Sequence, residues 1–166
     1  MSIEHDYFGV IAQDSTGGLY WSETIEVSEQ PVEVDLTAPQ AADVSEAGLD
    51  SAAAVIHALE GLDGRAREAL VADLSERESI TTQYIDQQVD DMGQSLLDVL
   101  VHNSGDIAMD VLRSLQLLRV SLRPDRTADD DVFAVFVYSI DPDETDAVLQ
   151  VGFDDRGDVV SVDDGQ

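Results

Sequence analysis

The hydrophobic pattern changes its period twice along this 166-residue chain, and that change constrains the fold more than any other feature. Apolar and polar residues alternate between residues 19 and 36, as in strands that bury one face. From residue 45 to residue 118, apolar residues recur every three or four positions, which predicts about four amphipathic helices. Alternation and short apolar runs then return up to residue 162. Strands at both ends with helices between them predict an α+β fold.

We expect a mainly antiparallel sheet, formed by strands from the N- and C-terminal thirds, with a central block of about four helices packed on one face. The expected organisation is a single domain over residues 1–166, with strands in 1–37, helices in 44–118, strands in 119–162 and a frayed tail in 163–166.

Turn residues set the expected boundaries within these blocks. A meander of three strands is predicted at the N-terminal end, over residues 5–12, 19–27 and 32–36. Gly61 and Gly64 are expected to bracket a short connection between the first two helices, because glycine weakens helix interiors. A further helical stripe runs from Ile80 to Leu100, and the last one continues to Leu118.

The charge balance restricts the classes of partner. Asp and Glu total 36 against eight basic residues, all of them arginine, for a net charge of −28. Such a surface repels nucleic acids and anionic membranes, so we expect neither as a partner and regard a basic protein as the partner it would attract. Asp outnumbers Glu 25 to 11 and lysine is absent, a bias that salt adaptation or a high-GC genome would also produce.

Cysteine is absent, which excludes disulfides and thiolate chemistry and fits a reducing compartment. The first residues lack the basic and apolar regions of a secretory signal, and no apolar run approaches the roughly 18 residues of a membrane helix. We therefore expect a cytoplasmic protein. Its oligomeric state is open.

One acidic stretch has spacing suited to metal ligands. Asp98, His102 and Asp106 follow one another at four-residue intervals, which would align them on one face of a continuous helix. Residues 103–105 (Asn-Ser-Gly) are expected to interrupt that helix and rotate Asp106 away. The alternative reading is a solvated acidic face.

No motif indicates catalysis or a cofactor. The histidines are His5, His57 and His102, and none adjoins a serine in a nucleophile-elbow pattern. The segment around Gly61 and Gly64 is not a phosphate-binding loop. We predict no catalytic residue and no cofactor.

Two minority features are candidates for partner binding. Tyr20 adjoins Trp21, the only tryptophan, on a predicted strand; alternation should place Trp21 in the core and leave Tyr20 exposed. Arg119 and Arg123 belong to a short arginine-bearing segment. They are expected either to pair with carboxylates across the sheet or to form a docking patch.

Seven blocks in order carry a resemblance to a known family: residues 5–9, 32–36, 62–67, 118–125, 133–140, 145–149 and 153–157. Together they resemble the bacterial family called domain of unknown function number two thousand and four. The resemblance spans nearly the whole chain and implies the same α+β fold and a bacterial cytosolic context. It implies no catalytic residue, because no activity is established for the family.

Three hypotheses for function follow. The first is a non-enzymatic protein-binding module, similar to an immunity protein or antitoxin, whose acidic face docks a basic partner. The second is a carboxylate- or metal-dependent enzyme built around residues 98–110. The third is a structural or oligomeric accessory protein that uses a sheet edge or a helix face as its contact.

Overall fold

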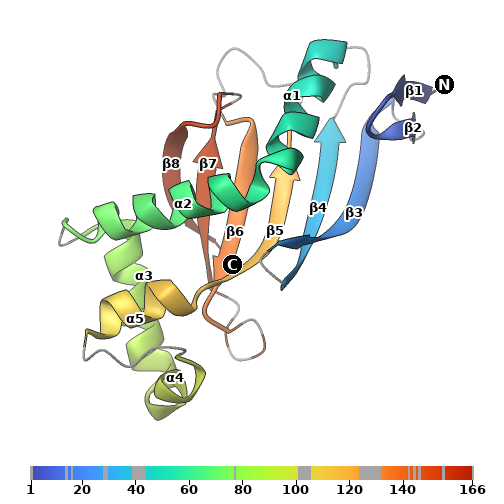
Figure 1. Cartoon of the computed structure of the whole chain (residues 1–166). Coiled ribbons are helices and arrows are strands. Elements are labelled where there is room, and N and C mark those ends of the chain that lie inside the picture. Colours follow the sequence, from blue (N-terminus) through green and yellow to red (C-terminus); the bar gives the residue numbers. More distant parts are fainter. Residues whose placement is uncertain are drawn as a thin grey trace.

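The computed structural model describes residues 2–13, 15, 17–27, 30–38, 44–76, 78–100, 106–123, 132–141, 143, 145, 147–154 and 156–165. In this part of the chain, strands from both ends form one six-stranded sheet, and helices from the middle pack against it (Figure 1). The predicted α+β fold, with a mainly antiparallel sheet and a central helical block, is confirmed.

The strands are β1 (Ser2–His5), β2 (Gly9–Ala12), β3 (Leu19–Val27), β4 (Gln30–Ala38), β5 (Gln116–Leu122), β6 (Ala134–Ser139), β7 (Val148–Phe153) and β8 (Val159–Gly165). The main sheet has the order β3-β4-β5-β6-β7-β8, and β1 pairs with β2 in a separate hairpin. Only the β4–β5 pair of the main sheet is parallel, because the helical block carries the chain back to the other end of the sheet between these strands.

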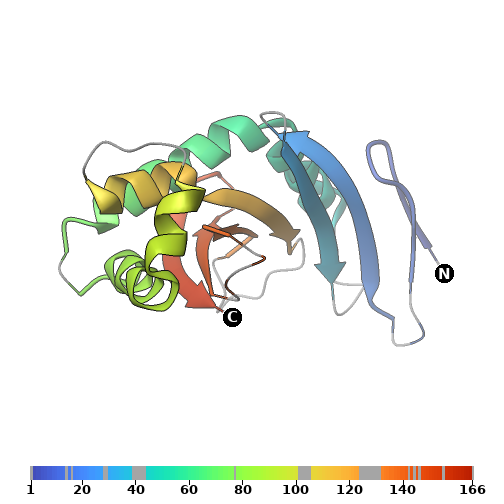
Figure 2. The same ribbon diagram turned by 90° about the horizontal axis from the view of Figure 1, so that it is seen from below.

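The helices are α1 (Glu46–His57), α2 (Leu59–Asp73), α3 (Ile80–Met92), α4 (Gln94–Val99) and α5 (Ile107–Ser114). Three begin at side-chain caps, where Ser45, Ser79 and Asp106 accept hydrogen bonds from backbone N–H groups of the first turn. Helices α1 and α2 lie across the same face of the sheet, while the β1–β2 hairpin lies beyond β3 (Figures 1 and 2).

The core lies between the sheet and these helices. The strand register aligns Val34, Val120, Phe136 and Val151 in one row across four strands, and none of the four is exposed to solvent. Burying each such side chain contributes roughly 1.5–3 kcal/mol to folding. The alternation that predicted the strands therefore points their apolar face at the helices.

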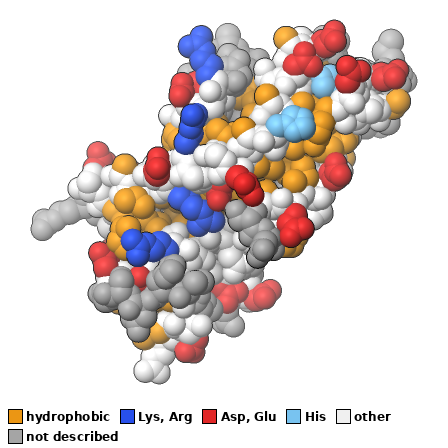
Figure 3. Space-filling view, viewed as in Figure 1, with side chains coloured by type: hydrophobic (Ala, Val, Ile, Leu, Met, Phe, Trp, Pro, Cys, Tyr) orange, Lys and Arg blue, Asp and Glu red, His pale blue; other side chains and the backbone are white. Residues whose placement is uncertain are grey.

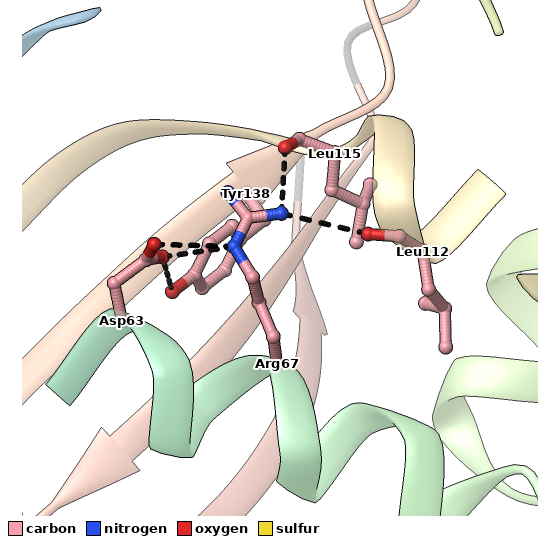
Figure 4. A network of polar contacts seen from close by, with 5 residues as sticks. All are labelled: Asp63, Arg67, Leu112, Leu115 and Tyr138. Carbon is pink, nitrogen blue, oxygen red and sulfur yellow. Dashed lines mark hydrogen bonds and ion pairs between the residues drawn. The ribbon is translucent and has the colours of Figure 1, made fainter. Parts of the chain in front are cut away.

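A polar network fastens α2 to the sheet (Figure 4). Tyr138 of β6 donates a hydrogen bond to Asp63 at 2.6 Å, and Arg67 donates from Nε to both oxygens of the same carboxylate at 3.2 Å. Arg67 also donates from Nη1 to the carbonyl of Leu115 at 2.9 Å. The network joins α2, β6 and the end of α5, so Asp63, Arg67 and Tyr138 stabilise the packing of the helices on the sheet.

Several predicted boundaries were wrong. Gly61 and Gly64 lie inside α2, and the connection between α1 and α2 falls at Ala58. The stripe Leu59, Leu62, Ala66 and Leu70 buries one face of α2, and this packing outweighs the low helix propensity of two glycines. The predicted third helix is divided at Gly93, whose φ of 55° ends α3.

The ends of the two strand blocks also differ from expectation. The predicted strand 5–12 is a hairpin, because the chain turns at residues 6–8 and Gly9 adopts a positive φ of 69°. Helix α5 stops at Ser114 rather than residue 118, and β5 begins at Gln116. Strand β8 reaches Gly165, so residues 163–165 pair with β7 instead of fraying.

Candidate functional site

The predicted metal ligands are only partly described. Asp98 is exposed on α4, whereas Asp106 caps α5 by accepting a hydrogen bond from the Met109 N–H at 3.2 Å. They belong to different helices, and His102 lies outside the described residues. Within the part of the chain that the structure describes, no three His, Asp or Glu side chains gather as possible metal ligands. The metal site stays a prediction.

The predicted partner-binding residues lie on the sheet. Tyr20 of β3 is 54% exposed, and Arg119 of β5 points to the same sheet face, opposite the core row. Arg119 donates from Nε to Asp35 at 2.5 Å, and this bond to the carboxylate raises the pKa of Arg119. Asp35 is only 1% exposed and accepts a second bond from Ser121 at 3.3 Å. The expected pairing with a carboxylate across the sheet is thus present for Arg119.

Arg123 is exposed just after the end of β5. Its backbone N–H donates to the Phe133 carbonyl at 2.8 Å, which continues the pairing of β5 with the start of β6. Whether it forms a docking patch with Arg119 stays a prediction.

The buried side of α3 carries polar groups as well. Tyr84 accepts a hydrogen bond from the Ile140 N–H at 3.1 Å and donates to the Ala147 carbonyl at 3.3 Å, which fastens α3 to the ends of β6 and β7. Gln88 is fully buried, and its amide has no hydrogen-bond partner among the described residues. An unsatisfied buried polar group costs about 1–3 kcal/mol, so the unpaired Gln88 amide reduces the stability that the packing of α3 contributes.

Aromatic rings gather where the β1–β2 hairpin meets β3 and α1. Tyr7 lies against Phe8, Trp21 and His57 at centroid distances of 5.0, 6.4 and 5.1 Å. Phe8 packs edge-on against Trp21 at 4.7 Å and lies 5.3 Å from His5. The turn at residues 6–8 places Tyr7 and Phe8 there, so the hairpin is fastened to the body by ring packing.

A hydrogen-bonded histidine supports this cluster from α1. The Tyr7 N–H donates to Nδ1 of His5 at 3.1 Å, and Nε2 of His5 lies 2.7 Å from the Asp50 carboxylate. Because Nδ1 accepts, the geometry assigns the neutral tautomer with its proton on Nε2, donated to Asp50. His5 is 9% exposed, so it joins the hairpin to α1 and leaves the outer rings to face solvent.

We call the solvent-facing part of this cluster the aromatic surface and define it by Tyr7, Trp21, Glu23, Asp50 and His57. Tyr7 is 37% exposed, His57 is exposed and Trp21 is half-buried, so Trp21 belongs to the rim of the core rather than to its interior. Burial, followed by the charge of Glu23, raises the pKa of Tyr7. In Figure 3, histidine side chains border a field of hydrophobic side chains on this side of the molecule.

The segment of the chain that forms the aromatic surface carries charge of one sign. Residues 1–64 contain 13 Asp and Glu and no Lys or Arg, and the first arginine is Arg65. Strands β1–β4 and α1 all belong to this segment. The residues of the aromatic surface therefore all belong to an arginine-free segment, residues 1–64, in which every formally charged side chain is negative.

Sequence reasoning missed this surface. Trp21 was assigned to the core, and the predicted single strand over residues 5–12 gave no reason to bring Tyr7 onto α1. Two signals could have indicated it. Tyr7-Phe8-Gly9 is a turn sequence that ends in glycine, and the lack of basic residues before Arg65 is readable from the sequence.

No family model, curated protein or solved structure matches this chain, so the family resemblance stays a prediction. None of the helices in the described residues is long and apolar enough to cross a membrane.

Proposed function

We propose that this chain is a non-enzymatic protein-binding module, of the kind that immunity proteins and antitoxins represent, and that its partner is a basic protein. The observation that carries the proposal is the coincidence of exposed aromatic rings with a segment, residues 1–64, whose formally charged side chains are all acidic. Aromatic residues dominate the energetics of protein interfaces, and carboxylates around them steer a basic partner to the site.

The aromatic surface suits a lysine or arginine side chain of the partner. Tyr7 and Trp21 offer ring faces for cation–π contact, which contributes about 0.5–2 kcal/mol per contact. Glu23 lies close enough to Tyr7 to raise its pKa. Asp50 is linked to the backbone of Tyr7 through the His5 ring. A cation on these rings would have a carboxylate within reach, which an isolated apolar patch would not supply.

Most of the other polar clusters in the described residues have a partner within the fold. Asp63 and Arg67 fasten α2, and Asp35 holds Arg119. These groups are hydrogen-bonded to fixed neighbours, and this favours binding over catalysis as the role of the chain. Arg67 also lines a hollow between α2 and α5.

The test has two steps. The chain is first used to capture partners from its source organism, and the recovered partner is then purified and titrated into the protein while the emission of Trp21, the only tryptophan, is recorded. We expect a basic partner whose binding shifts the Trp21 emission. Binding should weaken as salt rises from 0.05 to 0.5 M, because the screening length, roughly 10 Å at 0.1 M, becomes shorter at higher salt. Partners that are neither basic nor salt-sensitive would contradict the proposal.

Matched variants locate the contact. Tyr7→Ala should weaken binding at least tenfold, the size expected of one interface anchor worth about 1.4 kcal/mol or more. Tyr20→Ala is its control, because Tyr20 is also an exposed tyrosine but lies on the opposite side of β3 from Trp21. Glu23→Gln and Glu26→Gln form a second pair on the two sides of the same strand. If the Tyr20 and Glu26 variants weaken binding and the others do not, the partner docks on the sheet face instead.

A further inference from the structure

A hollow of about 260 Å³ opens where α1, α2 and the turn between β7 and β8 meet. Its floor is made of small and apolar residues of the two helices, Ala54, Ala58, Gly61 and Leu62, and Arg65 and Arg156 stand at its rim. Figure 3 shows arginine side chains (blue) in a band over this helical side of the molecule. The hollow is separate from the aromatic surface, since the two share no residue.

The charge of the hollow is opposite to that of the whole chain. Asp and Glu make up 36 of 166 residues, yet none of those that the structure describes lines the hollow. Neither Arg65 nor Arg156 forms an ion pair with a carboxylate in the described part of the chain, whereas Arg67 and Arg119 do. Two arginines that form no ion pair with a described carboxylate face one hollow, which offers a place for an external anion.

Arg65 is held in position at this rim. Its Nη1 donates to the Gly157 carbonyl at 3.0 Å, which uses one of the five N–H donors of the guanidinium. Gly157 has a φ of 81° and closes the β7–β8 turn, so the turn and the arginine fix each other. Arg156 precedes it on the same turn and is exposed. An incoming carboxylate can therefore meet one fixed guanidinium and one that can rotate towards it.

We propose that this hollow binds a small organic carboxylate with an apolar tail, such as a medium-chain fatty acid. The carboxylate pairs with Arg65 and Arg156, and the tail lies on the Ala54–Ala58–Gly61–Leu62 floor. The volume is slightly below the roughly 300–1,000 Å³ of most ligand sites, which limits the ligand to a small molecule. Carboxylates elsewhere on the chain do not prevent binding, because charges beyond about 10 Å are largely screened at 0.1 M salt.

Calorimetric titration with octanoate at 0.15 M salt tests the site, with acetate, octanol and octyl phosphate as comparison ligands. Octanoate should bind, while acetate, which lacks the tail, and octanol, which lacks the charge, should bind at least tenfold more weakly. Octanol binding as tightly as octanoate would overturn the role of the arginines. Tighter binding of octyl phosphate would overturn the assignment to a carboxylate.

Two pairs of variants make the test specific. Gly61→Leu fills the floor and should abolish octanoate binding, whereas Gly64→Leu, one turn along the same helix and outside the hollow, should leave it unchanged. A Cβ added at either glycine meets no atom within 4 Å, so both variants can keep the fold, which circular dichroism verifies. Arg156→Gln should weaken binding at least tenfold and Arg113→Gln, on α5, should not. Unchanged binding by Gly61→Leu would overturn the site, whatever the outcome at the aromatic surface.

Discussion

Two surfaces that share α1 differ in their chemistry. Asp50 and His57 belong to the aromatic surface, in the part of the chain that carries carboxylates and no basic residue. Ala54, four residues after Asp50 and three before His57, lines the neighbouring hollow, where two arginines stand and no carboxylate of the described residues does. The core-facing residues of the helix, such as Leu49 and Ala52, lie on the opposite face. A net charge of −28 thus conceals two adjacent surfaces of opposite charge.

This difference changes how the acidity is interpreted. Salt adaptation or genome composition accounts for many carboxylates and few basic residues, and it does not specify where along the chain the eight arginines lie. Nor does it place two arginines that form no ion pair with a described carboxylate beside an apolar hollow. We infer that the distribution, more than the total charge, carries the functional information.

The largest expected effect concerns the fastening of the aromatic surface. Phe8→Ala should lower the free energy of unfolding by about 3–5 kcal/mol, because Phe8 is 6% exposed and packs beneath Trp21. Urea denaturation measures the loss. Tyr20→Ala, at an exposed position of β3, should stay within about 0.5 kcal/mol. A loss below about 1 kcal/mol for Phe8→Ala would mean that ring packing does not hold the hairpin.

The next effect concerns the ion pair that joins β4, in the arginine-free segment, to β5 of the sheet. Arg119→Ala should cost about 1.5–3 kcal/mol, because it removes a charged hydrogen bond and leaves the buried Asp35 carboxylate with Ser121 alone. Adding Asp35→Asn should recover part of that loss. The same urea experiment on both single variants and the double variant gives the coupling, and strictly additive losses would show that the pair contributes nothing.

Alkaline pH should affect stability through the buried Tyr138 of the α2 network more than through Tyr7 of the aromatic surface. Burial, and then the Asp63 charge, raise the pKa of Tyr138, so the folded protein keeps a proton that the unfolded chain releases above its ordinary value of 10.0. Stability is therefore fully present below pH 10 and falls as the pH rises beyond it, by up to about 1.4 kcal/mol per pH unit. Tyr138→Phe should flatten this fall between pH 10 and 11.5, as measured by urea denaturation. Tyr7→Phe should flatten it less, since Tyr7 is 37% exposed; equal effects would contradict the difference in burial.

The smallest effect concerns the floor of the hollow. Gly61→Ala and Gly64→Ala should each raise the free energy of unfolding by roughly 0.5–1 kcal/mol, because alanine loses less backbone entropy inside a helix. Thermal unfolding of the two variants provides the comparison. A gain at Gly64 with a loss at Gly61 would indicate that the space beside Gly61 is occupied in the folded protein.

The class of fold could be predicted because, over most of the chain, the period of the apolar residues matches the face that each strand or helix buries. Alternation in Val32, Val34 and Leu36 leads directly to a buried face of β4. The prediction was wrong where the backbone conformation of one glycine sets the end of an element. Gly9 turns a predicted strand into a hairpin and Gly93 divides a predicted helix, while Gly61 and Gly64 stay helical. Local pattern cannot distinguish these glycines, because tertiary packing selects the conformation of each.

The candidate sites were less predictable. The pairing of Arg119 with a carboxylate across the sheet follows from strand neighbours, and it could be expected from sequence. The aromatic surface joins residues 7, 21 and 57, and the hollow joins α1 and α2 with Arg156, nearly a hundred residues further along the chain. Neither has a motif, since each depends on how distant elements pack.

The two surfaces of opposite charge beside α1 can be tested most directly by amide NMR of the isotope-labelled protein, titrated in parallel with an arginine-rich peptide and with octanoate. We expect the peptide to shift resonances of Tyr7, Trp21 and His57, and octanoate to shift those of Gly61 and Gly157. Peptide-induced shifts spread evenly over all the acidic surface, or the same residues shifted by both ligands, would contradict the existence of two separate binding surfaces of opposite charge that share α1.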